Sequence, residues 1–169
     1  MAQKETIALI GATTETGQLI VSRLLNLPCL LLLMDGSTDR LHALYHSLTT
    51  GTNEARVDLL SCSREASWEA DIILIAENED RLEAIADRIK EVATGKLVIF
   101  ITTDEDIESS LQLWLPYTQV VTVFVRKDAD AGQLFSIAIM ESRSKETLQK
   151  ADEFFKSLGI KKQAHSPQV

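Results

Sequence analysis

The sequence predicts a three-layer α/β fold, in which helices cover both faces of a doubly wound, mostly parallel sheet of about eight strands. Short apolar runs alternate with amphipathic segments along the whole chain. The runs at 71–76 and 97–101 are almost continuously apolar, as strands buried on both faces are. Because parallel neighbours need a crossover connection, and nearly all crossovers are right-handed, this alternation predicts the doubly wound arrangement.

Each element follows from its local pattern. Residues 79–93 place an apolar stripe at helical spacing with charges on the opposite side. Residues 144–158 do the same, with Ser144 at the N-cap position and Gly159 just past the last turn. The predicted strands are 6–10, 29–35, 56–60, 71–76, 97–101, 119–125, 134–140 and 160–164.

Composition predicts a single domain, residues 1–164, followed by a loosely held tail at 165–169. Of the 169 residues, 45% are apolar and 25% are charged, the mix of an ordinary globular protein. The formal charge of −8, from 25 acids and 17 bases, argues against nucleic-acid binding, which depends on clustered Lys and Arg. No window approaches the ~20 apolar residues of a membrane span. The start of the chain lacks a secretory pattern, so we expect a cytoplasmic protein that binds no nucleic acid and no membrane.

A glycine-containing loop follows the first strand, in the segment IALIGATTETGQLIVSRLL at 7–25. In an open α/β sheet the ligand crevice lies beyond the carboxyl ends of the strands. The unpaired N–H groups and the dipole of a helix N-terminus favour an anion there, such as a pyrophosphate. Gly11 permits the tight turn, and Gly17 lets the helix pack closely on the strand. The predicted phosphate-binding residues are Gly11, Ala12, Thr13, Thr14, Glu15, Thr16 and Gly17.

Thr14 stands where a G-x-x-G-x-x-G loop has its middle glycine. Two hypotheses follow from this position. In the first, the Thr14 side chain crowds the pyrophosphate, so that binding is weak or lost. In the second, the hydroxyls of Thr13, Thr14 and Thr16 donate hydrogen bonds to phosphate oxygens and compensate for the missing glycine. The sequence leaves both open.

The second predicted strand ends in an acid, Asp35, 24 residues after Gly11. A carboxylate there accepts hydrogen bonds from the adenosine ribose hydroxyls, which favours NAD and repels the 2′-phosphate of NADP. The alternative is that Asp35 caps the turn GSTDR that follows it. Ser37 and Arg40, just past the strand, suit a 2′-phosphate instead. We therefore expect Asp35, Ser37 and Arg40 at the adenosine ribose, with NAD and NADP both open.

Polar residues also follow the fourth and fifth strands, where a nicotinamide would lie if a dinucleotide were bound. Ala76, Glu77 and Asn78 come at the end of the fourth strand, and Thr102 and Thr103 at the end of the fifth. The alternative for both groups is helix capping, within ENEDRLE and TTDEDIE. Ala76, Glu77, Asn78 and Thr102 are the candidate residues on the nicotinamide side.

No residue stands out as catalytic or as a metal ligand. His42 and His46 are four apart, but the apolar stripe of their helix, which includes Leu41, lies elsewhere, and we expect both to face water. Cys29 and Cys62 lack the spacing of a zinc site or a disulfide framework, so we expect two reduced thiols. The catalytic residues are left unknown, and no metal is expected.

These motifs resemble a known group. The segment 7–25 is similar to the opening of the deazaflavin-dependent NADP reductases, whose loop has the form G-G-T-G-x-x-G. That group is related to the pyrroline-carboxylate reductase and 6-phosphogluconate dehydrogenase type of Rossmann domain. The resemblance continues through EADIILIAENEDRLEAIADRIKEVATGKLVIFITTD, QVVTVFV and LFSIAIMESRSKETLQKADEFFKSLGI. It implies an NAD(P)-binding Rossmann fold and an oxidoreductase that transfers hydride between a nicotinamide dinucleotide and an unidentified acceptor.

The sequence departs from that group at the site itself. In the family loop, glycines occupy the positions of Ala12 and Thr14, and a proline follows the fourth strand where Glu77 and Asn78 stand here. Related dehydrogenases add a helical domain that supplies substrate residues and a dimer interface. The resemblance therefore implies a homodimer, with a partner chain completing the substrate site.

A non-catalytic protein is the alternative function. The loop GATTETG also resembles the G-A-T-G-x-x-G loop of NmrA-like proteins, some of which sense the cofactor ratio without catalysis. On this hypothesis the chain is a dinucleotide-sensing or protein-interaction module that keeps the Rossmann fold without turnover.

Overall fold

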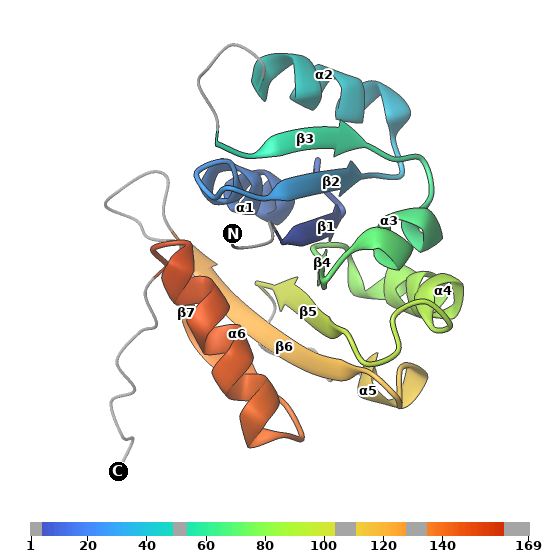
Figure 1. The fold of residues 1–169 in the computed structure, drawn as a ribbon, viewed down its shortest axis with the longest axis vertical. Helices are drawn as coiled ribbons and strands as arrows, with labels where there is room; N and C mark the ends of the chain where they lie inside the picture. The colour runs from blue at the N-terminus through green and yellow to red at the C-terminus, as the bar shows by residue number, and fades with distance from the viewer. Residues whose placement is uncertain (1–4, 49–53, 104–110, 128–134, 161–169) are drawn as a thin grey trace.

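In a computed structural model of the chain, which describes residues 5–48, 54–103, 111–127 and 135–160, one seven-stranded sheet lies between two layers of helices (Figure 1). Six strands are parallel, and β7 pairs antiparallel with β6. The strand order is β3-β2-β1-β4-β5-β6-β7. The strands are β1 (Thr6–Ile10), β2 (Leu30–Met34), β3 (Arg56–Leu59), β4 (Ile72–Ile75), β5 (Leu97–Thr102), β6 (Gln119–Lys127) and β7 (Phe135–Glu141).

The helices divide between the two faces of the sheet. Figure 1 shows α1 and α6 on one side and α3 and α4 on the other, and α5 packs with α4. Among the described residues, no helix has both the length and the apolar character needed to cross a membrane. The helices are α1 (Glu15–Leu24), α2 (Thr38–Leu48), α3 (Ser63–Glu69), α4 (Glu79–Ile89), α5 (Leu111–Trp114) and α6 (Lys145–Ser157).

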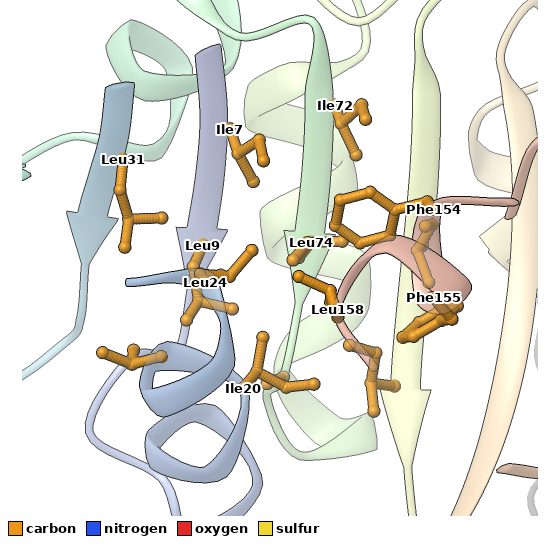
Figure 2. Close-up of a cluster of buried hydrophobic side chains, with 14 of the residues drawn as sticks. Ile7, Leu9, Ile20, Leu24, Leu31, Ile72, Leu74, Phe154, Phe155 and Leu158 are labelled. Carbon is orange, nitrogen blue, oxygen red and sulfur yellow. The ribbon is translucent and has the colours of Figure 1, made fainter. Parts of the chain in front are cut away.

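Two hydrophobic cores result from the alternation of side chains along each strand. In β1, Ile7 and Leu9 join the core under α1 and α6, while Ala8 and Ile10 join the core under α3 and α4. Figure 2 shows the first of these cores, where side chains of α1 and α6 meet those of β1, β2 and β4. Because both faces of these strands are buried, the sequence runs apolar without interruption.

The predicted count of about eight strands is wrong for the described residues. The sheet has six parallel strands and one antiparallel strand, because the run at 134–140 turns back along β6. The last predicted strand, 160–164, lies outside the described residues except for Ile160, which is not in a strand. The final helix is as predicted: the Ser144 hydroxyl accepts a hydrogen bond from the Thr147 N–H at 3.3 Å, and Gly159 has a positive φ of 73°.

The strand order reverses between β1 and β4. From β1 the chain proceeds to β2 and β3 on one side, whereas β4 begins the series β5, β6 and β7 on the other. The connections on the two sides therefore diverge, and the carboxyl ends of β1 and β4 border a crevice. The loops that follow these two strands are the ones in which the sequence predicts binding residues.

Candidate functional site

A pocket of about 390 Å³ lies at the carboxyl ends of β1, β4 and β5. It therefore brings together three segments that are far apart in the sequence, namely the start of α1 and the residues that follow β4 and β5. Ten residues line it: Thr14, Glu15, Thr16, Ala76, Glu77, Asn78, Asp80, Ile101, Thr102 and Thr103.

The two glycines of the loop after β1 are both required by close packing. Gly11 has a φ of +87°, and a Cβ at this position would lie 2.6 Å from the Ala76 carbonyl oxygen. Gly17 lies so close to the carbonyl oxygen of Gly11 that a Cβ there would collide with it. The loop is thus compressed between β4 and the first turn of α1, and only residues without a side chain fit at its two ends.

Thr14 is the N-cap residue of α1, which begins at Glu15. Its hydroxyl accepts a hydrogen bond from the Gly17 N–H at 3.0 Å. The same hydroxyl lies 2.8 Å from the carbonyl oxygen of Gly11 and 2.7 Å from that of Ala76, to which it donates. A hydroxyl has a single proton to donate. In this arrangement the proton of Thr14 is directed at the protein's own carbonyls.

Most amides of this loop are also used within the protein. The amides of Gly11 and Ala12 donate to Met34 O, and that of Thr14 donates to Gly11 O. The amide of Thr13 donates to the Asp35 carboxylate, and that of Gly17 donates to the Thr14 hydroxyl. Among the described residues, the amide of Thr16 has no hydrogen-bond partner. An anion at the start of α1 can therefore bind the Thr16 amide without breaking a protein hydrogen bond.

Asp35 joins the end of β2 to the loop after β1. One carboxylate oxygen accepts the Thr13 N–H and the other accepts the Ser37 N–H, each at 2.9 Å. The side chain is only 3% exposed, and Arg40 approaches it at 4.0 Å. Burial raises the pKa of Asp35, but the hydrogen bonds from Thr13 and Ser37 and the charge of Arg40 outweigh burial and hold the pKa below its ordinary value. Asp35 is therefore an ionised clamp between two loops.

Glu77 covers the turn at Gly11. A Cβ on Gly11 would lie 2.9 Å from the Glu77 Cγ, so the Glu77 side chain rests on this turn. Burial raises the pKa of Glu77, and the charge of Arg81 offsets part of that rise. Together with Glu15 and Asp80, Glu77 makes the pocket lining acidic.

Arg81, in the first turn of α4, reaches across to the end of β2. Its Nη1 atom lies 2.8 Å from the point that a Cβ on Gly36 would occupy. Arg81 could not be predicted as a site residue from the sequence, because nothing in the local pattern pairs it with a residue 45 positions earlier. Asp80 was not predicted either, although it lies in the first turn of a helix that begins at the pocket, and this position could have indicated it.

The remaining predicted residues are distributed over the same edge of the sheet. Asn78 is at the N-cap position of α4, but its side chain makes no capping hydrogen bond. Thr102 ends β5 and is buried, whereas Thr103 is exposed. His42 and His46 lie exposed on α2, outside the pocket lining.

Comparisons with known proteins agree with this geometry at the level of the fold. No family model matches the sequence, and no curated protein matches it. The structure is similar to that of a pyrroline-5-carboxylate reductase from Coxiella burnetii, with a TM-score of 0.71 and 17% identity over 98% of this chain and 60% of that chain.

Two further solved structures carry a bound dinucleotide. A pyrroline carboxylate reductase from Plasmodium falciparum with NADP bound has a TM-score of 0.66 and 16% identity over 95% of this chain and 57% of that chain. An imine reductase variant from Myxococcus stipitatus in complex with NAD+ has a TM-score of 0.68 and 16% identity, covering 92% of this chain and 53% of that chain. This chain thus spans between 53% and 60% of the length of the three proteins. The likeness shows that the chain has a Rossmann-like α/β fold.

Proposed function

We propose that the chain binds a nicotinamide dinucleotide across the crevice between β1 and β4 and takes part in hydride transfer as an oxidoreductase. The observation that carries this proposal is the loop 11–17, which follows β1 at the reversal of strand order and presents the first turn of α1 to a pocket. The likeness to reductases solved with NADP or NAD+ bound supports it.

The residues present fit the phosphate portion of such a ligand. The first-turn amides of α1 and the helix dipole attract an anion, and the Thr16 amide is available for one. Thr14 and Asp35 hold the loop in shape through hydrogen bonds rather than by touching the ligand. We assign the pyrophosphate to the loop formed by Gly11, Ala12, Thr13, Thr14, Glu15, Thr16 and Gly17, with the Thr16 amide as a donor.

The two ends of the ligand follow from this placement. The adenosine ribose lies by Asp35, Ser37 and Arg40 at the end of β2. The nicotinamide lies in the pocket by Ala76, Glu77, Asn78 and Thr102, where three carboxylates make the surroundings negative. A bound nicotinamide supplies or accepts the hydride, and the protein contributes orientation and electrostatics.

The hydride acceptor needs a second wall over the pocket. We propose that a second chain supplies that wall, in a homodimer or with a different partner, as the resemblance to dehydrogenases with a dimer interface implies. Deazaflavin is the first acceptor to test, because the loop resembles that of deazaflavin-dependent NADP reductases. Imines are the second, because the similar structures include an imine reductase.

Calorimetric titration with NAD+, NADH, NADP+ and NADPH tests the binding proposal. We expect saturable binding of at least one of them, and no binding of any of the four at millimolar concentration would refute it. Comparing two variants tests whether the first-turn amides of α1 bind the pyrophosphate. Thr16→Pro removes the amide that has no partner in the protein, within the first helical turn where proline is tolerated, whereas Thr16→Ala keeps that amide. Proline should weaken binding relative to alanine if the first-turn amides hold the pyrophosphate.

A further inference from the structure

Two arginines from separate parts of the chain lie near the end of β2. Gly36 is exposed and has no side chain of its own, and the guanidinium of Arg81 occupies the space beside it. Arg40, on α2, approaches Asp35 at 4.0 Å, and its side chain is 70% exposed. Ser37 follows Gly36 in the same turn and is half-buried.

Asp35 is poorly placed to accept hydrogen bonds from a ligand in this arrangement. Its side chain is 3% exposed, and each of its oxygens already accepts an amide N–H, from Thr13 and from Ser37. A ribose diol would have to displace these bonds or approach a buried carboxylate. Its negative charge is also partly balanced by Arg40 at 4.0 Å. The usual reason for a preference for NAD, an open acid at the end of β2, is therefore weak in this protein.

The turn at Gly36 suits a phosphate monoester instead. Guanidinium groups present several N–H donors in a planar fork that matches phosphate oxygens. The Ser37 hydroxyl accepts the Arg40 N–H at 3.3 Å, and its own proton can be donated to a neighbouring oxygen. A side chain at position 36 would occupy the same space as the Arg81 guanidinium. The glycine thus makes room for an arginine contributed by α4.

We infer that Arg40 and Arg81, both near the turn at Gly36–Ser37, form a phosphate-monoester site that selects NADP over NAD. The inference rests on the proposed function and adds to it the identity of the coenzyme and a residue, Arg81, that lies outside the β2–α2 segment. The charges of Glu77 and Arg81 interact, and in this assignment Glu77 holds the Arg81 side chain beside Gly36. Arg81 is a ligand-contacting residue in this assignment, and Glu77 is a positioning residue.

The test is the ratio of the dissociation constants for NAD+ and NADP+, measured by calorimetry on the full chain. The wild-type protein should bind NADP+ more tightly, and the advantage should shrink as salt is added. Arg81→Gln should weaken NADP+ binding at least about tenfold, as expected when a charged hydrogen bond is lost. It should leave NAD+ binding within about twofold, as for a surface substitution away from the ligand. Arg40→Gln should likewise weaken NADP+ binding more than NAD+ binding.

Arg88→Gln is the matched control, since Arg88 is exposed in the last turn of the same helix, away from Gly36. It should leave both constants unchanged. Inorganic phosphate, titrated alone, should bind far more weakly than NADP+; equal affinity would mean a general anion site and would overturn the assignment. A preference for NAD+ in the wild type, or an Arg81→Gln protein that binds both dinucleotides more tightly, would also overturn it. Failure of all four dinucleotides to bind would instead refute the proposed function.

Discussion

The hydroxyl of Thr14 lies 2.7 Å from the carbonyl oxygen of Ala76, and this hydrogen bond ties the loop after β1 to the end of β4. The residue that replaces the expected middle glycine is therefore a bridge across the reversal of strand order. The same hydroxyl accepts the Gly17 N–H at the start of α1. One side chain thus connects a strand end, a loop and a helix.

Thr14→Ala should destabilise the protein more than the loss of an ordinary helix cap. Removing an N-cap hydroxyl costs about 1 kcal/mol, and here the bond to Ala76 is lost as well. The comparison is Ser144→Ala, which removes the N-cap of α6, where the Ser144 hydroxyl accepts the Thr147 N–H. Urea unfolding of both variants measures the difference. Thr14→Ser should be near wild type, and an equal cost for the two alanine variants would contradict the bridging role.

Gly11→Ala should cost more than Gly95→Ala. Both glycines have positive φ, +87° and +76°, so each alanine has a similar backbone cost of about 1–2 kcal/mol. Only at Gly11 would the new Cβ collide with neighbouring atoms, the nearest being the Ala76 carbonyl oxygen at 2.6 Å; nothing lies within 4 Å of the corresponding point at Gly95. Free energies of unfolding from urea titrations give the comparison. Similar values for both would show that the loop relaxes away from β4.

Asp35→Asn should remove a pH-dependent part of the stability. The folded protein holds the pKa of Asp35 below its ordinary value of 3.8, so ionised Asp35 stabilises the fold above that pH. This stabilisation is lost as pH falls through the lowered pKa of the folded state. Since an amide nitrogen cannot accept the Thr13 or Ser37 N–H, we expect a loss of about 1–3 kcal/mol at pH 7. The difference in stability between wild type and variant should narrow in acid, and thermal unfolding at several pH values measures it. A difference that stays constant with pH would contradict the stabilising role of ionised Asp35.

Glu77→Gln should have the opposite pH dependence. Burial raises the pKa of Glu77 above its ordinary value of 4.5, so the folded state holds this proton more tightly than the unfolded state. The protonated form of Glu77 therefore contributes its full stabilisation in acid, and this contribution is lost as pH rises through the raised pKa. The variant should melt at a higher temperature than wild type at pH 7 and at the same temperature near pH 3. A lower melting temperature at pH 7 would show that the Arg81 charge outweighs burial.

The layered architecture could be predicted from the sequence because strands buried on both faces leave continuous apolar runs, as in β4 and β5. The antiparallel direction of β7 could not be predicted, since the same apolar pattern suits a strand of either direction. The helix α3 was also missed: it has only seven residues, and its buried positions are Ser63, Ala66 and Ser67, which form no apolar stripe.

The candidate site was predictable in position but not in its hydrogen bonding. The loop after β1 and the acid at the end of β2 are local motifs, and both lie at the carboxyl edge of the sheet. A threonine hydroxyl can donate or accept, so the sequence could not show that Thr14 would bond to Ala76, 62 residues away. Arg81 reaches Gly36 only because α4 begins beside the end of β4, which is a property of the tertiary fold.

The alternation of β1 between two cores has a consequence for how this chain can vary. Inserting or deleting one residue within Thr6–Ile10 would exchange the partners of Ile7 and Leu9 with those of Ala8 and Ile10. Ala8 packs in one core and the larger Ile7 and Leu9 pack in the other, so the packing of both cores would be disrupted at once. Changes of length are therefore confined to the loops, and at the carboxyl edge those loops are the ones that would meet a ligand. The strands of the sheet must therefore keep their length, whereas the loops that would determine ligand specificity can change in length.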